Sequence, residues 1–405
     1  MMKKFVNFLP EEIIFDILTR LPTESVLECK LVCQTWRSLI DRPSFPQKHL
    51  THLNHPCKSK LSYIYLNMWN HGNKHLYSFN YTDDWIRPKE KPIDNNLYYF
   101  EYDENWIQNE EKPIDRMTMF CLNPMFDSFI VLGSFNGVVC IHECRNDQPD
   151  GIACIFNPIT QEYCFLPDKN HWCLYLSVGF GYLPSTDEYK IVSIYGCDLN
   201  FVLVEVYTVG SGNGWRFIGK FNFSLYSRFG EVGVFANGAL YWRDRGKIVV
   251  FDLANEKFLE NLSPPPMLLE NDCDDKTVIG VSRGILFYAV NQTTEEGEEL
   301  FDVWLLNKKQ QGERLSLGWS KEFSLSQREP FTFTKYGYAL YYDQGRLRYD
   351  PIDLASHRFM GFTVIYPQVF PHKHTLVSLE QLGEEDTHIR RSRESEAESD
   401  HSSDW

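Results

Sequence analysis

The first 45 or so residues of the chain carry hydrophobic residues at helical spacing. Pro10 suits the first position of a helix, and Ile14, Leu18 and Leu21 follow at intervals of three or four residues. Pro22 ends that pattern, because proline interrupts a helix. Two further helical stretches follow, with apolar positions at Val26, Leu27, Leu31, Val32, Trp36, Leu39 and Ile40. This spacing predicts three short helices.

The three predicted helices together span residues 9–41, which is a small unit. Chains below about 40 residues rarely bury enough surface to be stable alone and usually need a partner, a metal or a disulfide. The apolar residues of this unit nevertheless cover more than one face of each helix. The surplus can pack on the remainder of the chain, or it can form a docking surface for another protein. Helices commonly dock in this way, which favours the docking surface.

From about residue 60 to residue 366 the pattern changes to short apolar runs between turn residues, which is typical of an all-β domain. Asn-Gly pairs at Asn136 and Asn237 lie 101 residues apart, and tryptophans at Trp215 and Trp319 lie 104 apart. The two motifs alternate, so each unit is close to 50 residues long, the length of a kelch-type blade. Counting a degenerate first unit gives six. We therefore expect a mostly antiparallel, six-bladed, kelch-like β-propeller rather than a β-sandwich.

Charge and composition restrict the partners and the compartment. The net charge is −15 and the isoelectric point about 5.3, so no nucleic-acid partner is expected. No apolar run approaches the roughly 20 residues that a membrane span needs, and no signal peptide is recognised, which predicts no membrane partner and a location in the cytoplasm and/or nucleus. The 11 cysteines include no C-x-x-C pair and are interpreted as reduced thiols.

Two further features could carry chemistry, but each has a plainer interpretation. His49, His52 and His55 recur every three residues before Cys57, yet they lie in a predicted linker without a second ligand pair, so no metal is expected. The glycine-rich segment 210–214 precedes a predicted strand rather than a helix, and is interpreted as a hairpin turn rather than a phosphate loop. With no carboxylate pair suited to acid–base chemistry and no G-x-S-x-G elbow, the sequence predicts no catalytic residues and no cofactor.

Three motifs of the helical segment carry a family resemblance: Leu9-Pro10-Glu11-Glu12-Ile13-Ile14, Ile17-Leu18-Thr19-Arg20-Leu21-Pro22 and Leu31-Val32-Cys33-Gln34-Thr35-Trp36-Arg37-Ser38-Leu39-Ile40. They resemble the F-box motif throughout its length. Gln34 is a departure, because a basic residue is more usual there, but the hydrophobic anchors are intact. The resemblance implies binding to a Skp adaptor, which bridges to cullin and RING subunits. The positions that match the adaptor-contacting pattern are Leu9, Pro10, Ile13, Ile17, Leu18, Leu21, Val32, Cys33, Trp36 and Leu39.

Motifs of the β region include Asn157-Pro158-x-Thr160, Gly179-Phe180-Gly181-Tyr182 and Gly233-Val234-Phe235-x-Asn237-Gly238-Ala239-Leu240. They resemble the F-box-associated domain of plant F-box proteins, an architecture that the S-locus F-box proteins share. The resemblance implies a domain that recognises a target protein. The expected domains are an F-box at 1–50, a linker and degenerate first β unit at 51–127, the propeller-like domain at 128–382 and an acidic disordered tail at 383–405.

The two resemblances together imply the substrate-recognition subunit of an SCF-type E3 ubiquitin-protein ligase, with no catalytic activity of its own. Such a subunit holds a target protein for ubiquitination and proteasomal degradation. Two alternatives stay open at this point. The propeller could bind a small molecule or act as an enzyme, or the chain could act with the Skp adaptor outside a ligase.

Overall fold

The structure, a computed structural model, describes residues 9–54 and most of 129–389. Its larger gaps in the second range are 144–150, 168–174, 226–231, 267–276, 294–298 and 352–367. Between 60 and 121, and between 330 and 351, the strands are described by their backbone pairing. Of the predicted disordered tail, residues 390–405 lie outside the described residues.

The helical segment forms the helices α1 (Glu11–Thr19), α2 (Thr23–Cys29), α3 (Gln34–Ile40) and α4 (Phe45–Leu53). The first three confirm the predicted trio. The fourth crosses residue 50, where the sequence placed the start of a linker, because Phe45 and Leu50 on α4 are both buried and need apolar neighbours. His49 and His52 therefore lie on a helix rather than in a linker, while His55 and Cys57 lie outside the described residues.

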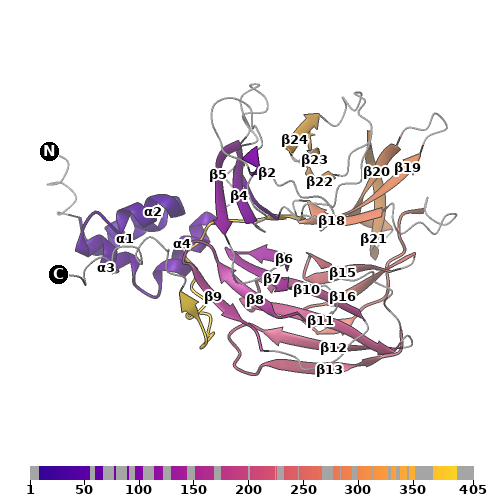
Figure 1. The fold of residues 1–405 in the computed structure, drawn as a ribbon, viewed down its shortest axis with the longest axis horizontal. Coiled ribbons are helices and arrows are strands. Elements are labelled where there is room, and N and C mark those ends of the chain that lie inside the picture. Colours follow the sequence, from indigo (N-terminus) through magenta and orange to yellow (C-terminus); the bar gives the residue numbers. More distant parts are fainter. Residues whose placement is uncertain are drawn as a thin grey trace.

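The strands form mostly antiparallel sheets that follow the helices in the chain (Figure 1). One sheet has the order β25 (Gln368–Pro371), β1 (Lys60–Leu66), β4 (Asn96–Asp103) and β5 (Ile114–Cys121), with a separate pair β2 (Tyr77–Ser78) and β3 (Lys89–Glu90). The next has the order β6 (Phe129–Phe135), β7 (Val138–Glu143), β8 (Ala153–Asn157), β9 (Glu162–Phe165) and β26 (His388–Ile389).

The remaining strands form a large sheet and two smaller ones. The large sheet joins β10 (Tyr175–Leu183), β11 (Glu188–Asp198), β12 (Phe201–Thr208) and β13 (Trp215–Phe221) to β14 (Val232–Ala236), β15 (Ala239–Asp244), β16 (Lys247–Asp252) and β17 (Lys257–Phe258). The smaller ones are β18 (Thr277–Ser282), β19 (Ile285–Thr293), β20 (Glu299–Gln311) and β21 (Arg314–Ser326), then β22 (Pro330–Phe333), β23 (Tyr338–Asp343) and β24 (Arg346–Pro351).

Successive sheets meet mainly through the strand at one end of each sheet. Strand β6 contacts β25 and β10, β10 pairs in parallel with β14, β14 contacts β18, and β18 contacts β22. The antiparallel pairing of β25 with β1 joins segments about 300 residues apart in the chain, as Tyr63 lies opposite Pro371. Successive sheets that meet through their innermost strands are characteristic of a β-propeller, which confirms the predicted fold class. The blade count of six stays a prediction.

The repeated motifs occupy equivalent places in this architecture. Asn136 and Gly137 both have positive φ, at 49° and 84°, and form the tight turn between β6 and β7, while Asn237 repeats the geometry between β14 and β15. The turns therefore lead out of the innermost strands. Trp215 and Trp319 each donate an indole N–H, at 2.8 Å, to a backbone carbonyl of the preceding unit, at Pro167 and Ser263 respectively.

The last described segment, residues 372–389, leaves β25 and crosses from the helices to the outer edge of the propeller; we call it the C-terminal strap. It ends in β26, which pairs with β9 (Figure 1). The predicted disordered tail was therefore placed too early, since residues 383–389 pack on the propeller and Glu384 is buried there. Within the described part of the chain, no helix is both long and apolar enough to cross a membrane.

Candidate docking surface

The helical domain has a small core of its own. Leu18, Val26 and Leu39 are almost fully buried between the helices, and the rings of Phe15 and Phe45 meet edge to face with centroids 5.3 Å apart. One row of apolar side chains from α1 is buried in this core. A second row lies outside it.

The second row faces solvent. Ile13 and Ile17 are four residues apart and lie on one side of α1, and Leu9 lies just before that helix begins. Leu9, Ile13 and Ile17 are 42%, 47% and 47% exposed. The turn between α2 and α3 exposes two more large apolar side chains, Leu31 at 78% and Val32 at 59%. We call these five residues the apolar face. Soluble proteins seldom leave so many large apolar groups exposed on so small a unit without a partner to cover them.

The structure separates the ten predicted adaptor-contacting residues into three groups. Pro10 and Cys33 are exposed beside the apolar face, which itself includes Leu9, Ile13, Ile17 and Val32. Leu21 and Trp36 are partly buried against the helical core. Leu18 and Leu39, each 1% exposed, belong to the core and so support the surface from beneath instead of forming it.

Sequence reasoning left Leu31 out of the predicted contact residues, although it is the most exposed large apolar residue described. Its signal was its position beside Val32 in the short connection between two helices, where both side chains prove to be exposed. Apolar pairs at a helix end are therefore candidates for contact residues.

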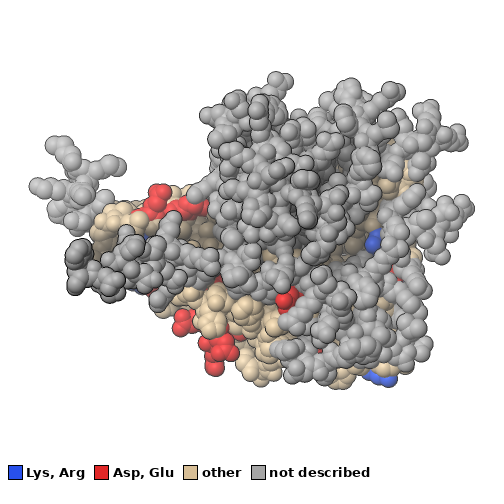
Figure 2. Space-filling model, viewed as in Figure 1, with Lys and Arg blue, Asp and Glu red and all other residues tan. Residues whose placement is uncertain are grey.

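Charged side chains of the helical domain form exposed ion pairs. Arg20 binds Asp16 at 3.0 Å, Arg42 binds Glu11 at 2.6 Å, and the hydrogen bond from Arg20 lowers the pKa of Asp16. These pairs are exposed, so each contributes little to stability. Acidic side chains are visible over the helical domain in Figure 2. An apolar centre with a charged rim is the usual composition of a protein–protein interface.

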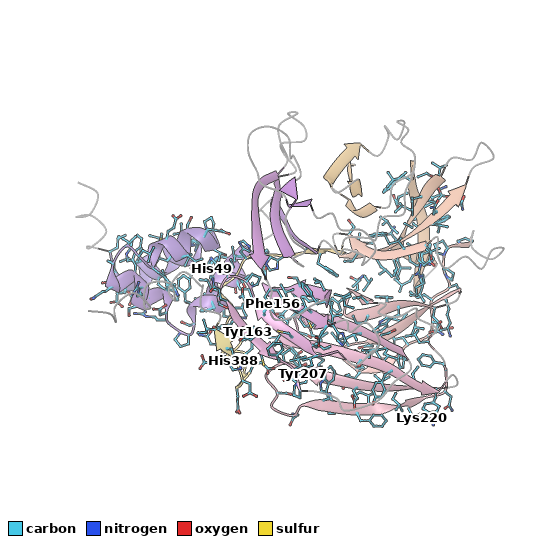
Figure 3. All side chains as sticks on the ribbon, in the orientation of Figure 1. His49, Phe156, Tyr163, Tyr207, Lys220 and His388 are labelled. Atoms are coloured by element: carbon cyan, nitrogen blue, oxygen red, sulfur yellow. The ribbon has the colours of Figure 1, made fainter. Side chains whose placement is uncertain are left out.

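Histidines of the helical domain and the strap have structural partners. His49 is fully buried on α4, and its Nε2 lies 2.9 Å from the carbonyl oxygen of Leu21 (Figure 3). His372 Nδ1 lies 2.7 Å from Ser134 Oγ, and burial lowers the pKa of His372. Among the described residues no three His, Cys, Asp or Glu side chains gather as a metal site would require. The candidate site is the apolar face.

Comparison with known families assigns both parts of the chain. Residues 7–48 match the F-box domain, and residues 95–355 match the F-box associated beta propeller domain. The second match covers more than half of the 405 residues. The chain therefore belongs to the family of F-box proteins with an F-box-associated β-propeller domain.

Similar proteins are found in Arabidopsis thaliana. The F-box protein At1g46984 is 26% identical over 62% of this chain and 61% of its own length, and At1g33530 is 28% identical over 69% of this chain and 53% of its own. F-box protein At3g20690 is 23% identical over 82% of this chain and 83% of its own length. The chain thus spans less than two thirds of the first two relatives. These matches are consistent with a plant F-box protein.

Proposed function

We propose that this protein is the substrate-recognition subunit of an SCF-type ubiquitin ligase, with the apolar face as the docking surface for a Skp-type adaptor. The observation that supports this most is the division of apolar residues within the F-box. Ile14 and Leu18 face the core while Ile13 and Ile17, each one position earlier in the chain, face solvent. Pro10 and Cys33 adjoin members of the apolar face in the chain, and with the partly buried Leu21 and Trp36 they complete the proposed contact set.

Covering the apolar face has a large favourable free energy. Burying one large aliphatic side chain contributes about 1.5–3 kcal/mol when it is fully exposed beforehand. Five partly exposed side chains therefore supply several kcal/mol in total, before the costs of association are subtracted. That is enough to drive a specific interface of moderate size.

The proposed mechanism is proximity. The adaptor bridges the F-box to a cullin and its RING subunit, while the propeller holds a target protein, which is ubiquitinated and then degraded by the proteasome. Holding the target near the charged enzyme replaces a bimolecular encounter with a local one, at an effective concentration that can reach the millimolar range or more. The bond-forming groups belong to the other subunits, so this chain needs no catalytic residue.

Reconstitution tests this proposal. The full chain is mixed with a Skp-type adaptor and a cullin–RING pair, and the mixture is separated by size-exclusion chromatography. We expect one complex that contains all the components in equal amounts. Recovery of the chain with the adaptor but without cullin would instead indicate a function outside a ligase. Separate elution of chain and adaptor would contradict the proposal.

A further inference from the structure

The C-terminal strap is hydrogen-bonded to the F-box helices. Thr23, the first residue of α2, donates its hydroxyl to the carbonyl oxygen of His374 at 2.6 Å, and that bond is buried. The imidazole Nδ1 of His374 lies 2.5 Å from the carboxylate of Glu24, the next residue of α2. Lys373 reaches α4 and donates to the carbonyl oxygen of Leu53 at 3.0 Å. The strap therefore fixes both α2 and α4.

The strap also completes the F-box core. Leu376 is 7% exposed and packs in the same cluster as Leu18, Val26 and Leu39. Conversely, Leu50 of α4 packs in the main core of the propeller, together with Val377 and Leu379 of the strap. The F-box and the propeller thus share their cores, and the strap supplies side chains to each.

On its other side the strap is held by the propeller. The amide of Asn157 donates to the carbonyl oxygens of Thr375 and Val377, at 3.2 and 2.7 Å. The carboxylate of Glu162 accepts from the Ser378 hydroxyl at 3.0 Å and from the Leu379 backbone N–H at 2.5 Å. Residues 375–379 of the strap lie outside any strand, so side chains of the second sheet supply hydrogen bonds to their backbone groups.

The far end of the strap is fixed by a buried carboxylate. Glu384 accepts from the Tyr207 hydroxyl, at 3.1 and 3.2 Å to its two oxygens, and from the Gly210 backbone N–H at 2.7 Å. Gly210 has a φ of +73°, and a Cβ there would lie 1.6 Å from the carbonyl oxygen of Leu382. Only glycine permits so close an approach of the two backbones. A glycine of the propeller, Gly210, is therefore required for the strap to pack at this point.

We propose that the C-terminal strap is a positioning element of the adaptor-docking surface. It holds α2 in place, and so presents Leu31 and Val32, which lie just beyond the end of that helix. The strap begins directly after β25, the strand that pairs with β1 across the ends of the propeller. Adaptor docking is thereby coupled to completion of the propeller. This inference rests on the proposed function.

The length of α2 explains why it needs this support. It has seven residues and no side-chain cap at its N-terminus. Helices this short are unstable in isolation, so tertiary contacts must hold them. Thr23, Glu24 and Val26 supply such contacts, and all three meet the strap or the core that Leu376 completes.

Two leucines of the strap provide a matched pair for the test. Leu376→Ala removes a side chain from the F-box core, whereas Leu379→Ala removes the same side chain from the propeller core. For each full-length variant, affinity for a Skp-type adaptor is measured by calorimetry, well below the unfolding midpoint, and amide exchange in α2 by mass spectrometry. Leu376→Ala should weaken adaptor binding about tenfold and speed exchange in α2. Leu379→Ala should change adaptor affinity and the rate of α2 exchange by less than twofold. Leu376→Met should restore the affinity and the exchange rate of the wild type.

Equal effects of the two alanine variants would overturn the inference, because a general loss of stability would then explain them. If Leu376→Ala does not fold, Thr23→Val replaces it, since it removes only the hydrogen bond to His374. Unchanged adaptor affinity and unchanged α2 exchange in that variant would also overturn the inference. If the wild-type chain fails to bind the adaptor, the proposed function fails, and the exchange data alone decide whether the strap positions α2.

Discussion

Replacing Ile13 and Ile17 together with alanine is expected to weaken binding to a Skp-type adaptor by about 100-fold or more. Buried anchor residues at the centre of an interface cost about 2 kcal/mol or more each when truncated, and each 1.4 kcal/mol is a factor of ten in affinity. Both side chains are 47% exposed in the free protein, and alanine has the highest helix propensity. The variant should therefore stay folded, with an unfolding midpoint close to that of the wild type.

Phe217→Ala is the matched control for that variant. Phe217 is also a large, exposed apolar residue, at 57%, but it lies on β13 of the propeller. Its replacement should leave adaptor affinity unchanged, as measured by calorimetry alongside the double variant. A loss of affinity in both proteins, or in neither, would show that the apolar face of the F-box is not the docking surface.

Trp242→Ala should cause the largest loss of stability, about 3–5 kcal/mol, because it empties a large volume at the centre of a core. Trp242 is fully buried on β15 and lies over the parallel pair of β10 and β14, where Gly179 is opposite Gly233. The two glycines leave room for its ring, since a Cβ on Gly233 would lie 2.5 Å from Trp242 Cε2. The shift of the urea unfolding transition measures the effect.

Gly233→Ala tests the same contact from the other side. Overfilling a packed core costs about 1–3 kcal/mol, so this variant should also unfold at lower urea concentration. Alanine at 233 should cost much less in a Trp242→Ala background, because the ring that it meets is gone. Strictly additive losses in the double variant would contradict the packing described for this junction between two sheets.

The repeat pattern predicted much of the propeller because turn chemistry is local. Asn136-Gly137 and Asn237-Gly238 have the positive φ values that such turns require, and the two residues of each pair are among the few that adopt them readily. Trp215 and Trp319 were recognised as equivalent from spacing alone, and both tie one unit to the preceding one. The period did not reveal which strand lies innermost, since that depends on contacts between units.

The site was only partly predictable because α1 is apolar on two sides. Adjacent positions on a helix are 100° apart, so Ile13 and Ile14 necessarily face different directions. Both rows suit a core, and the sequence offers no local signal for which of them faces the core. Leu18 was assigned to the contact surface from the family resemblance, and the structure places it in the core.

The strap could not be predicted from local sequence. Its contacts join Thr23 to His374 and Asn157 to Val377, which are separated by 351 and 220 residues. The same charged composition that suggested disorder includes Glu384, which instead becomes a buried hydrogen-bond acceptor. Composition predicts only the average behaviour of a segment. It does not show that a single carboxylate, Glu384, is hydrogen-bonded to the propeller.

Alkylation of Cys33 tests most directly whether an adaptor covers the exposed side of the F-box. Cys33 is exposed and adjoins Val32, whereas Cys154 and Cys164 are buried, and burial together with Glu384 raises the pKa of Cys164 to about 12. At pH 8, mass spectrometry of the free wild-type protein should show iodoacetamide modifying Cys33 and sparing the two buried thiols. Saturating Skp-type adaptor should slow modification of Cys33 at least tenfold. An adaptor complex in which Cys33 reacts as fast as in the free protein would contradict docking at this surface.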